Sequence, residues 1–202
     1  DIADDLTEMI RVSPQIPRVM RPLGGFLGNF YIKKNISNAE LVILTTNNLL
    51  DTYNIPKKKS KSISNGVDIK NFHYQANAKE KLNLHDFIIG YVGVLREWVD
   101  FKPVFKALNS LDDNIKFLIV GSEGNIKYHK KLAKRYNVHD RVIFTGMVPY
   151  SKIPLYISAM DIGLIPFETS GIAENALPLK LFEYMACERP VISTEISAVK
   201  KA

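Results

Sequence analysis

Residues 87–93 read FIIGYVG, a continuous apolar run closed by a glycine. An unbroken run of this length is typical of a strand that is buried on both faces, as in a parallel sheet. Residues 101–109 follow with apolar side chains at helical spacing, and residues 116–121 (KFLIVG) form a second such run. The order strand, helix, strand predicts a crossover between parallel strands.

The same alternation continues toward the C-terminus. The expected elements are a basic amphipathic helix at 125–136, a strand at 142–146, a short helix at 151–159, a strand at 162–166, a helix beginning near Pro178, which is favoured at a first helical position, and a strand starting at 190–193. This pattern predicts an α/β fold with a doubly wound, Rossmann-like parallel sheet. A ligand would then bind at the edge that carries Gly93, Gly121, Gly146 and the loop after Pro166.

The first part of the chain follows a different pattern. Residues 1–54 are mainly helical and then contain a strand at 40–44, which predicts the C-terminal part of a preceding α/β domain. Residues 55–86 contain Pro56 and four lysines near their start, and they are expected to be a linker and the start of the next domain. Residues 87–202 are expected to be that domain, incomplete at its C-terminus. The start at Asp1 instead of a methionine suggests residues missing upstream.

Composition is that of an ordinary globular protein, with 46% hydrophobic and 24% charged residues. The single cysteine, Cys187, allows no internal disulfide and favours a reducing, cytoplasmic location. The net charge of +6 includes lysine runs at 33–34 and 57–61. These runs are either solvated or attracted to an anionic inner-membrane surface. No aromatic residues interleave with them, so nucleic acid is not an expected partner.

Several kinds of catalytic chemistry have no motif here. The chain lacks a phosphate-binding P-loop, a dinucleotide fingerprint and a Gly-x-Ser-x-Gly nucleophile elbow. Its four histidines stand singly and are expected on surfaces or loops, not as metal ligands. No Asp-x-Asp occurs, so a metal-dependent sugar transferase is not expected, and neither a metal nor a cofactor is predicted.

Five further patterns, in order, resemble glycosyltransferase family 4. They are residues 63–68 (ISNGVD), 90–95 (GYVGVL), the pair 117–121 (FLIVG) and 142–146 (VIFTG), 161–166 (DIGLIP), and 178–186 (PLKLFEYMA) with 189–192 (RPVI). The resemblance implies the GT-B fold and a nucleotide-sugar donor, UDP- or GDP-linked, held by this domain. It implies a glycan or lipid-linked acceptor held by the preceding domain.

The resemblance also implies roles for individual residues. The base would contact the backbone at Met147 and Val148, Glu183 would hold the ribose, and the diphosphate would rest on N–H groups near Leu179 and Lys180. Helix N-termini suit phosphates, since they carry unpaired N–H groups and partial positive charge. Gly93 and Gly121 would let the backbone approach the donor closely.

Three positions depart from the family pattern. Asn175, with Glu174 beside it, stands where the family has the first of two paired glutamates; both are candidate donor-site residues, and Asn175 can bond sugar hydroxyls without supplying charge. Val94 and Val99 replace the arginine and lysine that neutralise the leaving diphosphate, so Arg96 and Lys180 are expected to take that role. Pro178 replaces a glycine and removes one N–H donor.

The function expected from these residues is retaining transfer of a sugar to a hydroxyl acceptor, as in polysaccharide biosynthesis. Two alternatives stay open. One is a GT-B sugar-nucleotide epimerase, and the other is a non-catalytic sugar-nucleotide-binding module, which Val94, Val99 and Asn175 make plausible. A GT-B enzyme works in a cleft between two domains, and the residues before 55 are too few for an acceptor domain. We therefore expect these 202 residues alone to be inactive.

Overall fold

The computed structural model describes residues 1–13, 15–121, 124–169 and 171–200. The chain divides into two compact units. Unit 1 comprises residues 1–65, 169–177 and 195–202, and unit 2 comprises residues 66–168 and 178–194. The predicted domain limits at 54 and 86 stay a prediction.

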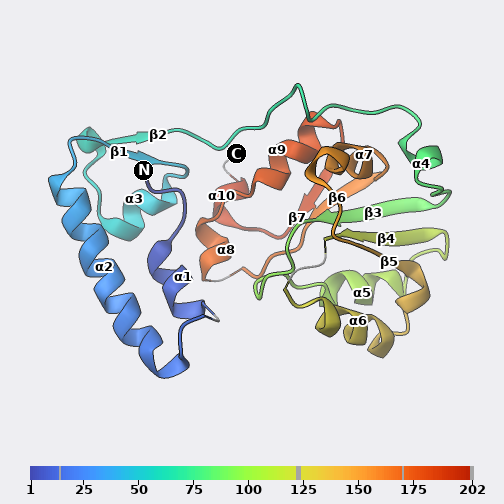
Figure 1. Cartoon of the computed structure of the whole chain (residues 1–202), viewed down its shortest axis with the longest axis horizontal. Helices are drawn as coiled ribbons and strands as arrows, with labels where there is room; N and C mark the ends of the chain where they lie inside the picture. Colours follow the sequence, from blue (N-terminus) through green and yellow to red (C-terminus); the bar gives the residue numbers. More distant parts are fainter. Residues whose placement is uncertain (14, 122–123, 170, 201–202) are drawn as a thin grey trace. The chain divides into compact units, whose positions relative to one another are not determined.

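Unit 2 is built on a five-stranded sheet in which all neighbouring strands run parallel (Figure 1). The strands are β3 (Phe87–Val92), β4 (Ile115–Val120), β5 (Val142–Gly146), β6 (Ile162–Ile165) and β7 (Val191–Ser193), and their order is β5-β4-β3-β6-β7. The predicted α/β fold with a parallel sheet is confirmed. Each strand lies within two residues of the run that predicted it, because unbroken apolar runs mark strands covered on both faces.

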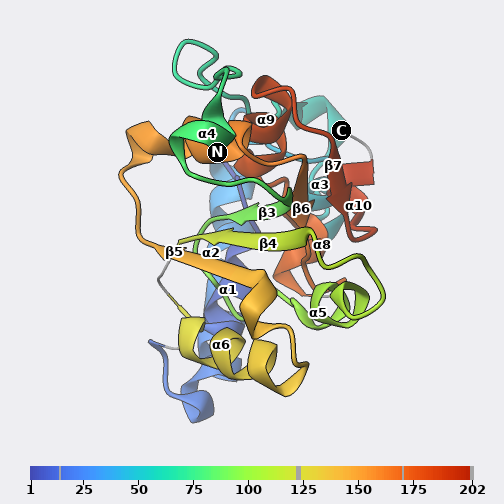
Figure 2. The ribbon, with the colours of Figure 1, turned by 90° about the vertical axis from the view of Figure 1, so that its right-hand side faces the viewer.

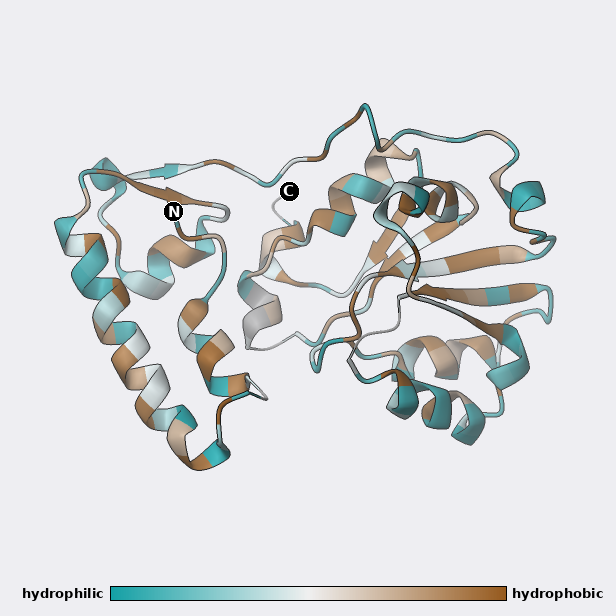
Figure 3. Ribbon diagram, viewed as in Figure 1, coloured by the Kyte–Doolittle hydropathy of each residue, from teal (hydrophilic) through white to brown (hydrophobic). Residues whose placement is uncertain are grey.

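Helices cover both faces of this sheet. Helices α5 (Lys102–Leu108) and α6 (Ile126–Arg135) lie on one face, and α7 (Ile153–Ser158) and α9 (Leu179–Ala186) lie on the other (Figures 1 and 2). The strands at the centre are strongly apolar, whereas the outer surface of α6 is hydrophilic (Figure 3). The remaining elements of unit 2 are short: α4 (Ala78–Lys81), η3 (His139–Arg141) and η4 (Tyr150–Lys152).

Small residues at the centre of the sheet allow α9 to pack closely. Gly163 of β6 faces Tyr184, and a Cβ at Gly163 would lie 2.7 Å from the tyrosine ring. The hydroxyl of Tyr184 accepts a hydrogen bond from the amide of Val92 (2.9 Å). Tyr184 is fully buried. This packing fixes α9, and with it the residues predicted to hold a donor, against the ends of β3 and β6.

An aromatic cluster fills the opposite face of the sheet. Phe101 meets Phe117 edge-on with ring centroids 5.0 Å apart, and it also contacts His129 at 4.6 Å. His129 is buried on α6. The expectation that all four histidines lie on surfaces or loops is therefore wrong for His129. Its imidazole acts as part of the apolar packing, and burial lowers its pKa.

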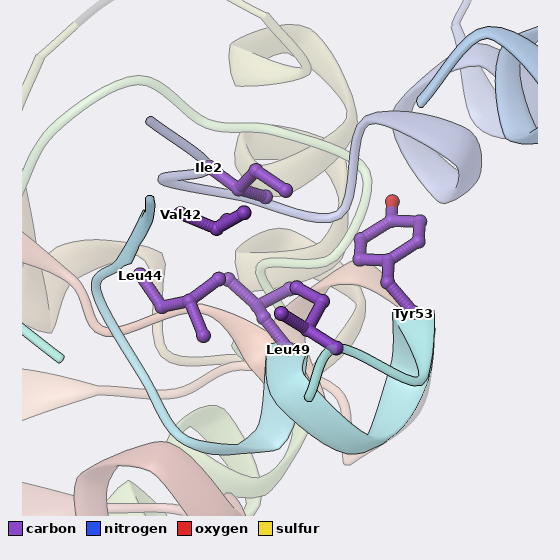
Figure 4. Close-up of a cluster of buried hydrophobic side chains, with 6 residues drawn as sticks. Ile2, Val42, Leu44, Leu49 and Tyr53 are labelled. Atoms are coloured by element: carbon purple, nitrogen blue, oxygen red, sulfur yellow. The ribbon is translucent and has the colours of Figure 1, made fainter. Parts of the chain in front are cut away.

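Unit 1 contains α1 (Leu6–Val12), η1 (Arg18–Met20), α2 (Arg21–Asn38), β1 (Val42–Leu44), α3 (Asn48–Tyr53), η2 (Lys57–Lys59), β2 (Ser60–Ser62), α8 (Ile172–Asn175) and α10 (Ser197–Lys200). Its core joins β1, α3 and the first residues of the chain (Figure 4). The buried side chains are Ile2, Val42, Leu44, Leu49, Tyr53 and Ile55.

The segment predicted as a linker contains regular structure. Residues 60–62 form β2, which pairs in parallel with β1. Three polar residues, Ser-Lys-Ser, gave no strand signal, because their pairing depends on backbone hydrogen bonds to β1 and not on side-chain burial. Among the residues that the structure describes, no helix is long and apolar enough to cross a membrane.

Candidate functional site

The order of the strands in unit 2 reverses between β3 and β6, the place where an open parallel sheet forms a crevice. The chain passes from β3 to β4 and β5 on one side, then crosses to β6 and β7 on the other side. In open parallel sheets, ligands bind outside the carboxyl ends of the two strands at such a reversal. Here these strands are β3, which Gly93 follows, and β6, which is followed by Pro166 and Phe167.

The loops after β3 and β6 are joined by backbone hydrogen bonds. The amide of Asp100 donates to the carbonyl of Pro166 (2.8 Å), and the amide of Glu168 donates to the carbonyl of Trp98 (2.8 Å). The Tyr91 hydroxyl donates to the carbonyl of Val94 (2.9 Å), which holds the start of the first loop. The two loops therefore form one connected wall of the crevice.

Lys180 places an ammonium group in this crevice. Its Nζ lies 5.0 Å from the ring centroid of Tyr91 and 4.8 Å from that of Phe167. It is also 3.4 Å from the position that a Cβ on Gly93 would occupy. Cations are attracted to aromatic faces, so the two rings fix the amine beside the end of β3. Burial lowers the pKa of Lys180 to about 8, although the nearby Glu183 opposes the shift.

This lowered pKa predicts a pH-dependent affinity for anions. As pH rises through about 8, the empty site loses the proton of Lys180, whereas a bound diphosphate would hold that proton in place. Affinity for a nucleoside diphosphate is therefore expected to fall from pH 7.5 to 9.5 by about tenfold per pH unit above the pKa. Calorimetry in two buffers of different ionisation enthalpy would measure the coupled proton uptake. A flat profile in the wild type, matching that of Lys180→Met, would contradict this role of Lys180.

Four predicted donor-binding residues line one pocket of about 250 Å³. They are Gly93, Gly121, Met147 and Val148. Gly93 and Gly121 both have φ near +135°, a region that favours glycine, and a Cβ on Gly121 would overlap the carbonyl oxygen of Gly93. Met147 is 68% exposed at the mouth. The structure thus brings the predicted phosphate and base contacts into one concave surface of unit 2.

Helix α9 carries the remaining predicted contacts of unit 2. It begins at Leu179, which is exposed, and Pro178 precedes it in an extended conformation as the N-cap, not as the first helical residue. Glu183 lies one turn along. Burial raises the pKa of Glu183, and both Lys180 and Tyr150 oppose that shift by stabilising the anion.

The structure shows what surrounds Val94 and Val99, the two residues that stand where the family has cations. Val99 is buried and bridges to Phe167, so it forms part of the crevice wall. Val94 lines the pocket. Arg96 is exposed, and its charge acts on Tyr91, whose pKa is raised by burial and lowered by Arg96. Of the two expected substitutes, Lys180 contacts the Tyr91 ring, whereas Arg96 acts on that tyrosine only through its charge.

Asn175 and Glu174 belong to unit 1, where they form the end of α8. The side-chain amide of Asn175 donates to Asp5 and to the hydroxyl of Thr52, both at 3.4 Å. The side chain of Glu174 lies outside the described part of the structure. The structure does not gather these two residues with Lys180 in one compact unit, and their predicted roles stay predictions.

Sequence reasoning missed three side chains around the predicted site. Tyr91 and Phe167 form the aromatic surroundings of Lys180, and Tyr150 opposes the rise in the pKa of Glu183. Tyr91 lies within an apolar strand, where an aromatic residue indicates only core packing. Phe167 is the second residue after β6, at the carboxyl edge of the sheet, and that position was the one available signal.

Comparison with known proteins gives consistent findings. The sequence model of the family described as "Glycosyl transferases group 1" matches residues 74–202. TuaH of Bacillus subtilis, named as a teichuronic acid biosynthesis glycosyltransferase, is 28% identical over 151 residues, which cover 72% of this chain and 36% of TuaH. Protein CapJ of Staphylococcus aureus is 30% identical over 151 residues, which cover 70% of this chain and 36% of CapJ. This chain thus spans about a third of the length of these relatives.

Solved structures show the same fold. The sucrose-phosphate synthase of Thermosynechococcus elongatus superposes with a TM-score of 0.76 at 24% identity, over 97% of this chain and 49% of that protein. HepE of Anabaena, solved in complex with UDP, gives a TM-score of 0.71 at 19% identity, over 94% of this chain and 52% of HepE. The fold is that of the GT-B glycosyltransferases. Because the family model covers more than half of the residues, the chain belongs to the glycosyl transferases group 1 family.

Proposed function

We propose that the chain is the donor-binding part of a retaining glycosyltransferase of family 4. The enzyme would transfer a sugar from a UDP- or GDP-linked donor to a hydroxyl group of a glycan or lipid-linked acceptor. The observation that carries this proposal is the ammonium of Lys180, held between Tyr91 and Phe167 at the carboxyl ends of β3 and β6. A cation fixed at that crevice is suited to the negative charge that develops on a departing diphosphate.

The pocket and α9 supply the other parts of a donor site. The diphosphate would lie along Gly93 and the start of α9, the base at Met147 and Val148, and the ribose at Glu183. HepE, a solved neighbour with the same fold, has been captured with UDP and with UDP-glucose. TuaH is named for teichuronic acid biosynthesis, and this name supports a polysaccharide acceptor.

Transfer would proceed without a bound metal ion. Arg96 and Lys180 would neutralise the leaving diphosphate, a task that a divalent cation performs in other nucleotide-sugar enzymes. Both side chains are cationic at neutral pH, so neither has to gain a proton before it can stabilise the leaving diphosphate.

We further propose a cytoplasmic enzyme that contacts the anionic inner-membrane surface through unit 1. Helix α2 contains no acidic residue, includes Lys33 and Lys34, and exposes Phe26 and Phe30. Apolar side chains beside lysines favour binding to anionic lipid headgroups. Sedimentation with anionic vesicles but not with neutral ones supports this contact, and equal sedimentation with both would contradict it.

Donor screening tests the proposed function. The Tm of the chain would be measured in EDTA with each member of a panel of nucleoside diphosphates and nucleotide sugars. The ligands that raise the Tm would identify the class of donor that binds. A two-domain enzyme carrying these residues would then be given the ¹³C-labelled donor, and NMR would report the anomeric configuration of the product. Binding with retained configuration supports the proposal. Binding without turnover by the two-domain enzyme favours the non-catalytic module, and conversion of the donor sugar to an epimer favours the epimerase.

A further inference from the structure

Helix α6 carries a concentration of positive charge that the donor site does not use. Five of its ten residues are lysine or arginine and none is acidic, and all five cations are exposed. They are Lys127, Lys130, Lys131, Lys134 and Arg135. Like charges three or four positions apart on a helix repel each other, so this pattern lowers the stability of α6. The charge therefore needs a reason outside the helix.

These cations have almost no partners within the protein. In the part of the chain that the structure describes, none of the five forms an ion pair. Only Lys130 has an aromatic contact, with its Nζ 5.4 Å from the ring centroid of Phe144. The inner side of α6 is anchored by its buried residues His129, Leu132 and Ala133, whereas its outer surface is hydrophilic (Figure 3). The cations are thus available to an anionic ligand.

A hollow of about 580 Å³ lies at the start of α6. Its lining residues are Gly124, Asn125, Ile126, Lys127, Tyr128 and Lys131. The two lysines stand one turn apart on the helix, and the Tyr128 side chain between them in sequence is 48% exposed. An aromatic ring offers an apolar face to a sugar ring, and two ammonium groups offer charge-assisted hydrogen bonds to carboxylates. The hollow therefore combines contacts for a sugar with contacts for an acid.

The hollow adjoins the pocket of the candidate donor site. The amide of Asn125 donates to the carbonyl of Leu95 (2.9 Å), and Leu95 pairs with Gly124 in an isolated bridge. Val94, the residue before Leu95, lines the pocket of about 250 Å³ that Gly93 and Gly121 also line. The two concave surfaces of unit 2 are therefore neighbours across the loop after β3.

A membrane is a less suitable partner for α6 than a sugar chain. Helices that bind in a membrane interface insert an apolar face among the lipids. The apolar side of α6 is buried, and Tyr128 is the one large hydrophobic residue that the helix exposes. A single ring beside a hollow fits a sugar and does not form an inserting face.

We propose that α6 and this hollow form a binding surface for an acidic glycan, a sugar chain that carries repeated carboxylate groups. Lys127 and Lys131 would bind the carboxylates, and Tyr128 would stack on a sugar ring. The remaining cations of α6 would attract the chain over a longer range. The inference goes beyond the proposed donor site, because it requires neither a nucleotide nor a transfer reaction.

Binding of a defined acidic glycan tests the proposal. Fluorescence anisotropy would measure the Kd of the 202-residue chain for labelled oligogalacturonate, a linear chain of uronic acids, and for its fully methyl-esterified form. The esterified form keeps the sugars and loses the charge. We expect it to bind about tenfold or more weakly than the acid form, whose affinity should also fall as the salt concentration rises.

Two variants test the named residues. Lys127→Gln with Lys131→Gln should raise the Kd for oligogalacturonate about tenfold or more, as for lost hydrogen bonds to charged groups. The matched control is Lys70→Gln with Lys81→Gln, which removes the same charge from exposed positions of unit 2 and should change the Kd by less than about twofold. Tyr128→Ser should raise the Kd for oligogalacturonate about fivefold and leave that for polyphosphate, which has no sugar ring, within about twofold.

Several results would overturn the proposal. Equal binding of the acid and esterified glycans, or an unchanged Kd in the Lys127 and Lys131 double variant, would remove the role of charge. If Tyr128→Ser weakens neither polyanion, or both alike, the surface does not recognise a sugar. Sedimentation of the wild type with phosphatidylglycerol vesicles, without binding to oligogalacturonate, would identify a membrane surface instead. The Kd for UDP and GDP should be the same in the double variant and the wild type, and a matching loss would assign both lysines to the donor site.

Discussion

Neutralising Arg96 and Lys180 together is expected to reduce turnover of the two-domain enzyme by about 10³-fold, and nucleoside affinity by less than about threefold. Lys180 lies against Tyr91 beside the end of β3, and Arg96 follows β3 in the next loop. A diphosphate gains negative charge only as the sugar departs, so cations at this place stabilise the transition state more than the bound donor. Steady-state kinetics of Arg96→Gln with Lys180→Met would measure kcat, and calorimetry would measure nucleoside binding.

The matched control is Lys106→Met, which removes an exposed cation from α5 in the same unit. It should leave turnover unchanged. If the double variant instead loses nucleoside affinity and turnover by the same factor, Arg96 and Lys180 support the structure of the site and do not stabilise the leaving group.

Gly121→Ala is expected to lower the free energy of unfolding of unit 2 by about 3 kcal/mol or more, from backbone strain and overpacking together. Gly121 has a φ of +138°, and the added Cβ would overlap the carbonyl oxygen of Gly93. The obstacle is the backbone of the loop after β3. The amide of Gly93 in that loop donates a 2.9 Å hydrogen bond to the carbonyl of Val120, which holds the loop in place. No side-chain rotation can therefore relieve the overlap.

Urea unfolding followed by tryptophan fluorescence would measure this effect. The chain has a single tryptophan, Trp98, which lies in unit 2 and reports on that unit. Gly66→Ala serves as the control, because nothing lies within 4 Å of the added Cβ, and its effect should stay within about 0.5 kcal/mol. Equal midpoints for Gly121→Ala and Gly66→Ala would contradict the steric account.

The parallel sheet could be predicted from the sequence because its signal is local. The runs at 87–93 and 116–121 are apolar at every position, and only strands covered on both faces require this. The pocket residues Gly93 and Gly121 could be predicted for a related reason. Glycines that close such strands lie where the chain must turn away from the carboxyl edge.

The surroundings of Lys180 could not be predicted in this way. Lys180 is 89 positions from Tyr91 and 13 positions from Phe167 in the chain. The contact with Tyr91 depends on the order of the strands in the sheet, which the periodicity of the sequence does not give. His129 was misjudged for a similar reason, because a lone histidine in a basic helix gives no sign of the phenylalanines beneath it.

Asn175 makes contacts that a motif does not reveal. Its spacing from Glu183 predicts a place in the donor site, which stays a prediction, and the structure adds that its amide bonds Asp5 and Thr52, which are far from it in sequence. The segment 169–177 belongs to unit 1 by its contacts, although unit 2 residues flank it on both sides in the chain. Spacing along the chain carries no information about such an exchange between units.

Calorimetric titration of the chain in EDTA tests the central claim most directly. The titrants are UDP, GDP and the matching nucleosides, and the proteins are the wild type, Lys180→Met and Lys106→Met. We predict that one nucleoside diphosphate binds about tenfold or more tightly than its nucleoside, as for a charge-assisted contact to phosphate, and that only Lys180→Met abolishes this difference. Failure of both diphosphates to bind the wild type, or an undiminished difference in Lys180→Met, would contradict a donor site at the ends of β3 and β6.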